Sequence, residues 1–110
     1  MHAVVITFDL VDMSPEQYAR VAAELAPSFE ALPGLLTKVW LEDVEHARRG
    51  GFYLFADAAS ADGFLGSALA RGVAENPHFA GLEARRFAVD ETTTALTQPR
   101  VVVVSTPVGA

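Results

Sequence analysis

The sequence predicts an α+β fold whose strands and helices follow one another in the order β-α-β-β-α-β. Residues 3–10 form a short run rich in Val and Ile, residues 33–57 have the pattern of a β-hairpin with aromatic arms, and an amphipathic helical segment follows each of these. An alternating strand over residues 82–89 completes a ferredoxin-like arrangement with one four-stranded antiparallel sheet. We therefore expect one domain over residues 1–98 and a valine-rich extension over residues 99–110.

The first helix has a well-marked start. Ser14 is placed to cap it, Pro15 takes the first helical position, and Gln17 completes a capping box. Pro27 interrupts the backbone hydrogen bonds, so it should kink the helix near Ala23 or end its regular part there. The apolar stripe that should face the core consists of Tyr18, Val21, Ala22, Leu25, Phe29 and Leu32.

The hairpin holds most of the unusual side chains. We expect its arms over Leu35–Val44 and Phe52–Ala56, with Gly50-Gly51 supplying the conformational freedom of the turn region. Lys38 and Trp40 share one face of the first arm, because side chains alternate along a strand. The opposite face is more apolar and suits packing of sheet on sheet, so we place Lys38 and Trp40 on the side of a pocket.

The second helix and the C-terminal tail complete the chain. Asp57 or Ser60 can cap a helix in which residues 61–69 present an apolar face, and Gly72 or Asn76-Pro77 can end it. Four consecutive valines at 101–104 should pair with a sheet edge of this or another subunit, and a disordered tail is the alternative.

Composition limits the partners. A net charge of −6, with Lys and Arg together numbering 8, argues against nucleic acid, because phosphate binding needs clustered cations. The sequence shows no apolar run long enough for a bilayer and no secretory signal pattern, and cysteine is absent. We therefore expect a cytoplasmic protein without a membrane segment.

Four side chains are candidates for catalysis. Lys38 can act as a general base if burial lowers its pKa, or it can hold an anion; the alternative is an exposed strand lysine. Trp40 and Tyr53 offer hydrogen-bond donors within apolar walls, although both can equally fill the core or an interface. His78 can shuttle protons, and no histidine stands in metal-ligand spacing.

The chain resembles the YdhR-type monooxygenases of the dimeric α+β barrel superfamily from about His2 to Gln98. The resemblance depends on the Pro27-interrupted helix, Pro33-Gly34, KVW at 38–40, and GGFYLFAD at 50–57 followed by Ser60-Ala61. It implies a homodimer whose two sheets face each other and a pocket between sheet and helices in each subunit. It also implies that Phe55 takes a pocket position at which cofactor-free oxygenases of the superfamily carry Trp.

We therefore predict a monooxygenase that uses neither metal nor flavin and acts on an aromatic or polycyclic phenol. Lys38 and Arg85 would hold the anion, Trp40 and Tyr53 would orient it, and His78 would transfer protons. Two alternatives remain open: an oxygen-independent cyclase or isomerase, and a binding protein without catalysis. The predicted aromatic wall consists of Phe8, Phe29, Phe55, Phe64 and Phe87.

Overall fold

A computed structural model describes residues 1–97 of the chain. The strands are β1 (His2–Leu10), β2 (Leu35–Asp43), β3 (Arg48–Phe55) and β4 (Phe79–Ala88). The helices are α1 (Pro15–Glu30), α2 (Ala58–Leu65), α3 (Ala68–Glu75) and the short α4 (Glu91–Thr94). The predicted valine strand at 101–104 lies outside the described residues.

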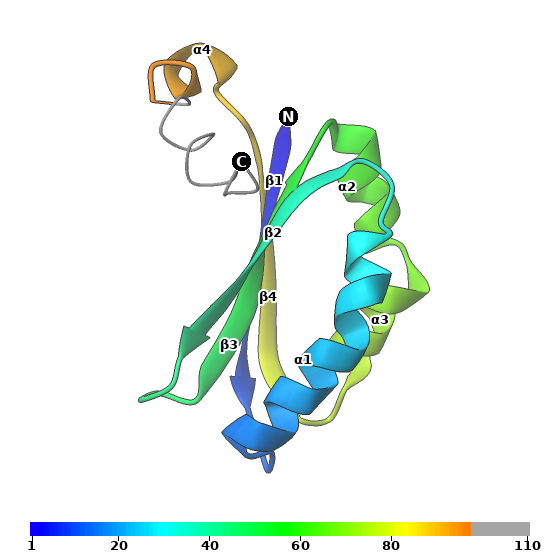
Figure 1. Cartoon of the computed structure of the whole chain (residues 1–110), viewed down its shortest axis with the longest axis vertical. Coiled ribbons are helices and arrows are strands. Elements are labelled where there is room, and N and C mark those ends of the chain that lie inside the picture. Colours follow the sequence, from blue (N-terminus) through cyan, green and yellow to red (C-terminus); the bar gives the residue numbers. More distant parts are fainter. Residues whose placement is uncertain (98–110) are drawn as a thin grey trace, which may run out of the picture.

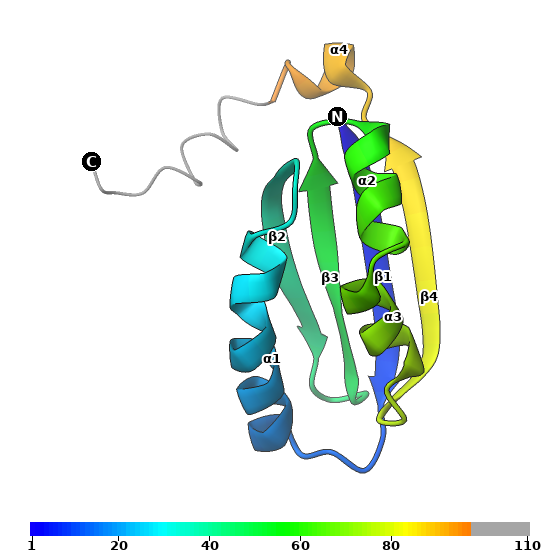
Figure 2. The ribbon, with the colours of Figure 1, turned by 90° about the vertical axis from the view of Figure 1, so that its right-hand side faces the viewer.

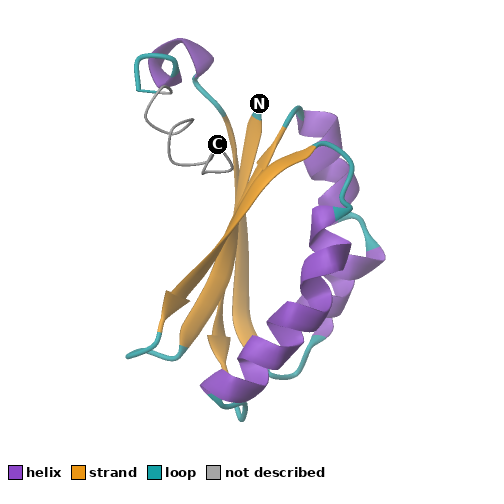
Figure 3. Ribbon diagram, viewed as in Figure 1, coloured by secondary structure: helices purple, strands orange, loops and turns teal. Residues whose placement is uncertain are grey.

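The four strands form one antiparallel sheet in the order β2-β3-β1-β4, which confirms the ferredoxin-like βαββαβ fold. Helices α1, α2 and α3 all lie on one face of this sheet; within residues 1–97 no helix covers the other face, and the short α4 lies beyond the end of β4 (Figures 1 and 3). In Figure 2, α1 lies along β2 and β3, whereas α2 and α3 lie over β1 and β4. No helix among residues 1–97 is both long and apolar enough to cross a membrane.

The core lies between the sheet and the three helices. Val4, Ile6 and Phe8 alternate along β1 toward the helices and are all buried. Phe29 from α1 and Phe64 from α2 meet them from the helical layer, and each is at most 3% exposed. Burial of such side chains contributes roughly 1.5–3 kcal/mol each to folding.

The predicted start of α1 is confirmed, and one expectation about its end is wrong. Ser14 accepts a hydrogen bond from the Gln17 backbone, and the Gln17 side chain accepts one in return from Ser14. The helix then continues through Pro27 to Glu30, so its regular part does not end near Ala23. Pro27 lies in the last turn, where its missing N–H costs a single intrahelical bond.

The hairpin forms, but its glycines are not in the turn. The turn lies between Asp43 and Arg48 and includes Ala47 at a φ of 52°, whereas Gly50 and Gly51 are buried within β3. A Cβ at Gly50 would collide with the Ile6 carbonyl oxygen of the neighbouring strand. Close packing, and not turn geometry, therefore requires these glycines.

The predicted second helix is in fact two helices. Asp57 caps α2 by accepting from the Ser60 backbone N–H at 2.8 Å, as expected. Gly66 ends α2, and Ser67 starts α3 by accepting from the Ala70 N–H at 3.1 Å. Ser67 thus offers the backbone a cap in place of a continuous helix.

Candidate functional site

The chain's only lysine lies beside a buried tyrosine on the helical face of the sheet. Lys38 on β2 and Tyr53 on β3 are partners in the strand register, and Lys38 Nζ donates to the Tyr53 hydroxyl at 2.6 Å. Tyr53 is 4% exposed. The two polar tips therefore meet among aromatic side chains.

Three aromatic rings surround the amine. Lys38 Nζ lies 4.0 Å from the ring centroid of Phe29, 4.0 Å from that of Trp40 and 3.9 Å from that of Tyr53. Ring faces favour the charged ammonium, but loss of water favours the neutral amine. Burial lowers the pKa of Lys38 to about 7, and it raises the pKa of the Tyr53 phenol above its usual value. At neutral pH the site therefore holds a protonated phenol beside a lysine that can accept a proton.

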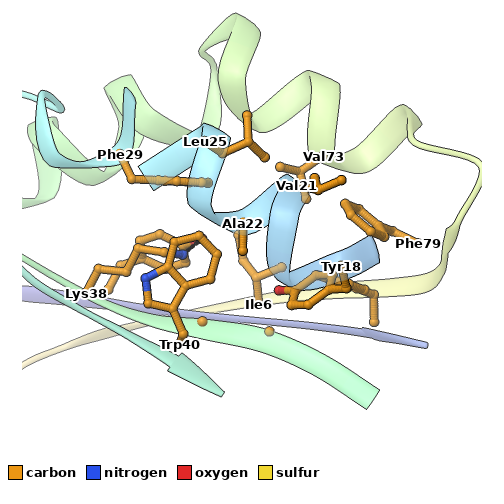
Figure 4. A pocket seen from close by; sticks show the side chains of 14 residues that line it. Ile6, Tyr18, Val21, Ala22, Leu25, Phe29, Lys38, Trp40, Val73 and Phe79 are labelled. Carbon is orange, nitrogen blue, oxygen red and sulfur yellow. Dashed lines mark hydrogen bonds between the residues drawn. The ribbon is translucent and has the colours of Figure 1, made fainter. Parts of the chain in front are cut away.

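A small, partly open cavity adjoins this pair. Its volume is about 20 Å³, which is enough for one water-sized molecule and too little for an aromatic ring. Figure 4 shows its roof, formed by Val21, Ala22 and Leu25 of α1, and its floor on the sheet, where Lys38 and Trp40 stand. We refer to it as the inner cavity.

An open groove of about 530 Å³ lies between α1 and β2, outside the inner cavity. Its helical wall carries small side chains, among them Ala19, Ala23 and Ala26. Trp40, which is 40% exposed, borders both the groove and the inner cavity. The groove has the size of a typical small-molecule site, and Trp40 separates it from Lys38.

The predicted aromatic wall is divided between cavity and core. Phe8 and Phe29 line the inner cavity, as Trp40 and Tyr53 do. Phe55 and Phe64 do not line it; they pack behind Tyr53 and are 0% and 2% exposed.

Three other predicted residues lie elsewhere. His78 contacts the Val11 carbonyl oxygen at 2.8 Å through Nδ1 and borders a separate surface hollow near the start of α1. Arg85 and Phe87 alternate with Arg86 on β4, and Phe87 is 54% exposed on the face without helices. The structure therefore does not bring His78, Arg85 or Phe87 to the inner cavity.

Several residues of the site were not among the predicted site residues. Tyr18, Val21, Ala22 and Leu25 line the inner cavity, and their spacing on the predicted apolar stripe of α1 could have identified them. Arg49 borders the groove, whereas the adjacent Arg48 is exposed. Among residues 1–97, no group of three or more His, Asp or Glu side chains is placed to hold a metal ion.

The fold and the site define a small ferredoxin-like protein with an aromatic, lysine-containing cavity between its sheet and its helices. A sequence model of the family described as "Putative mono-oxygenase ydhR" matches residues 4–100, and the chain belongs to this family. Membership supports a monooxygenase-like function. No curated protein matches the chain.

Solved structures of low sequence identity share the fold. A putative antibiotic biosynthesis monooxygenase from Caulobacter crescentus CB15 is 22% identical, with a TM-score of 0.64 over 81% of this chain and 90% of the other. The NE2512 protein of unknown function from Nitrosomonas europaea is 20% identical, with a TM-score of 0.62 over 81% and 88%. A mutant of SnoaB, a cofactor-independent oxygenase from Streptomyces nogalater, is 14% identical, with a TM-score of 0.63 over 81% and 93%.

Proposed function

We propose that this protein is a cofactor-independent monooxygenase that acts on an aromatic or polycyclic phenol, with Lys38 as its general base. The observation that carries the proposal is the Lys38–Tyr53 pair, held at 2.6 Å among three aromatic rings. A base with a pKa near the working pH is the most effective proton acceptor, and burial gives Lys38 a pKa of about 7. Family membership supports the oxygenase class.

The substrate would lie in the α1–β2 groove against Trp40, because the inner cavity cannot hold a ring. In this proposal the half-exposed Trp40 side chain moves aside, and a proton leaves the acidic O–H or C–H of the substrate and is taken up by Lys38 Nζ. The Tyr53 hydroxyl, which stays protonated, can donate a hydrogen bond to the oxyanion that develops.

The overall change that this chemistry requires is balanced without a cofactor. The substrate anion is oxidised by dioxygen, one oxygen atom enters the product as a carbonyl, and the other leaves as water. A CH₂ group flanked by phenolic rings supplies both the electrons and the hydrogen atoms. Anthrones carry this CH₂ group, whereas hydroquinones lack it and give a hydroxyquinone and water by the same overall balance. These are the two substrate types to test.

We also propose that the chain forms a homodimer through the sheet face that carries no helix. Val39, Leu41 and Phe87 are 47%, 37% and 54% exposed on that face. Exposed apolar side chains that face the same side of a sheet from both of its edge strands mark an interaction site. The sheet-to-sheet dimer expected from the family resemblance would cover it.

Oxygen uptake with anthrones and hydroquinones, without added cofactor, tests the enzyme proposal. We expect saturable uptake that Lys38→Met lowers by roughly 10²–10⁴-fold in kcat and that Tyr53→Phe lowers less. Turnover that continues without oxygen would instead establish the cyclase or isomerase alternative. Ligand binding without any turnover would establish a binding protein.

A further inference from the structure

Arg49 is a buried charged side chain with no role in the proton transfer proposed above. It lies on the helical face of β3 and is 5% exposed. Its guanidinium carbon is 5.3 Å from the ring centroid of Tyr18 on α1, and it borders the α1–β2 groove. The adjacent Arg48 is exposed and pairs with Asp9 at 3.2 Å.

Arg49 makes one side-chain hydrogen bond within residues 1–97, and its other N–H groups keep access to solvent, because no fully buried side-chain nitrogen of these residues lacks a partner. Nη1 donates to the Arg48 carbonyl oxygen at 2.9 Å, and the guanidinium has five N–H donors in all. No carboxylate of the described residues lies within 4.0 Å of its nitrogens. A guanidinium that is largely covered, pairs with no carboxylate and keeps accessible N–H groups beside the groove is placed to bind an anion.

The nearest carboxylate in the strand register does not satisfy Arg49. Glu42 is the register partner of Arg49 on β2, but its side chain is exposed and the two form no ion pair. Both charges lie close enough to Tyr18 to act on its phenol in opposite directions, although burial is the largest cause of the raised Tyr18 pKa. Glu42 therefore repels an anion that approaches Arg49, but it does not itself serve as the ion-pair partner of Arg49.

We propose that Arg49 anchors a carboxylate carried by the planar aromatic ligand of the groove. A planar, weakly hydrated guanidinium binds a carboxylate through two parallel N–H···O bonds and packs against an aromatic face, and Tyr18 supplies such a face. Arg49 and Tyr53 are four residues apart on the same face of β3, so their backbones are about 13 Å apart. A ligand of about three fused rings spans this distance, with its carboxylate at Arg49 and its reactive edge toward Lys38.

This inference rests on the proposed function for the position of the reactive edge, but binding alone can test it. The probes are two anthraquinones that differ at one substituent: rhein, which carries a carboxylate, and aloe-emodin, which carries a neutral hydroxymethyl group there. Dissociation constants are measured for the whole chain at neutral pH by calorimetry or fluorescence. Arg48→Gln is the matched control, because it removes the same charge from the adjacent exposed position.

We expect wild-type protein to bind rhein more tightly than aloe-emodin. Arg49→Gln should weaken rhein binding by roughly tenfold to a hundredfold, and it should change aloe-emodin binding far less. Glu42→Gln should tighten rhein binding, whereas Arg48→Gln should leave the preference for rhein unchanged. Arg49→Lys keeps the positive charge but lacks the two parallel N–H donors of a guanidinium, so it should lose part of the preference for rhein. This substitution is the second variant if Arg49→Gln does not fold.

Three results would overturn the proposal. The first is equal affinity of the wild type for rhein and aloe-emodin. The second is an equal loss of affinity for both probes in Arg49→Gln, and the third is that the wild type binds neither probe. Arg49-dependent rhein binding, without oxygen uptake when anthrones replace the anthraquinone probes, would keep the anchor and refute the oxygenase. Oxygen uptake with anthrones that carry a carboxylate or a neutral group, unaffected by Arg49→Gln in both cases, would keep the oxygenase and refute the anchor.

Discussion

Replacing Lys38 with Met should change how the stability of the protein depends on pH. Met has a similar length and no charge, so it removes the amine from the aromatic cage without emptying the site. It leaves the Tyr53 hydroxyl without its partner, which costs about 1 kcal/mol at every pH. The pH-dependent part of the difference between the two proteins therefore reports on the Lys38 amine alone.

The sign of this pH dependence follows from whether the folded or the unfolded chain holds the Lys38 proton. Burial lowers the pKa of Lys38 from 10.5 to about 7, so between these values the unfolded chain holds a proton that the native chain has lost. Wild-type stability therefore rises with pH in this range, and the cost of burying the charge is complete only below about pH 7. At ~1.4 kcal/mol per pH unit the full cost would be about 5 kcal/mol. Because the side chain is partly exposed, solvent screening reduces it to about 2 kcal/mol.

Urea unfolding of both proteins between about pH 6 and pH 9.5 measures this effect. We expect Lys38→Met to be more stable than wild type by about 1 kcal/mol near pH 7, and the difference should shift by about 1.5 kcal/mol in favour of wild type by pH 9.5. Because Lys38 is the chain's only lysine, its side-chain carbon resonance also gives the pKa directly by NMR. Parallel stability profiles, together with a resonance that titrates near 10.5, would refute the argument for a neutral amine.

Two further substitutions test the close packing of the site and the open sheet face. Gly51→Ala places a Cβ about 2.8 Å from Lys38 Nζ, so the flexible lysine side chain should move. We expect the free energy of unfolding, measured with urea, to fall by about 1–2 kcal/mol, and the pKa of Lys38 to lie closer to its ordinary value. Gly63→Ala meets nothing within 4 Å and should leave the Lys38 pKa unchanged; the same pKa in both variants would contradict the packing argument. Val39→Asp should raise the dimer dissociation constant roughly tenfold or more in analytical ultracentrifugation, whereas Val44→Asp, in the hairpin turn, should not; equal effects would place the interface elsewhere.

Local signals in the sequence were sufficient for the order of the elements. The Ser14 capping box and the Asp57 cap operate within a few residues, so they can be recognised without knowledge of the fold. The two buried glycines could not be assigned in this way. The need for Gly50 comes from the Ile6 carbonyl on another strand, and sequence spacing does not show that contact.

The site itself depends on which face of each strand meets the helices. Alternation along β2 placed Lys38 and Trp40 together, and register pairing with β3 then added Tyr53. The same alternation separates Arg49, on the helical face, from Arg48 beside it, on the other face, although the two are identical in sequence terms. A single step of register would exchange their roles, because successive side chains point to opposite faces. Which arginine lies at the groove thus depends on how the strands pair. The sequence had favoured Arg85, and only the folded sheet could show that Arg49 takes this position.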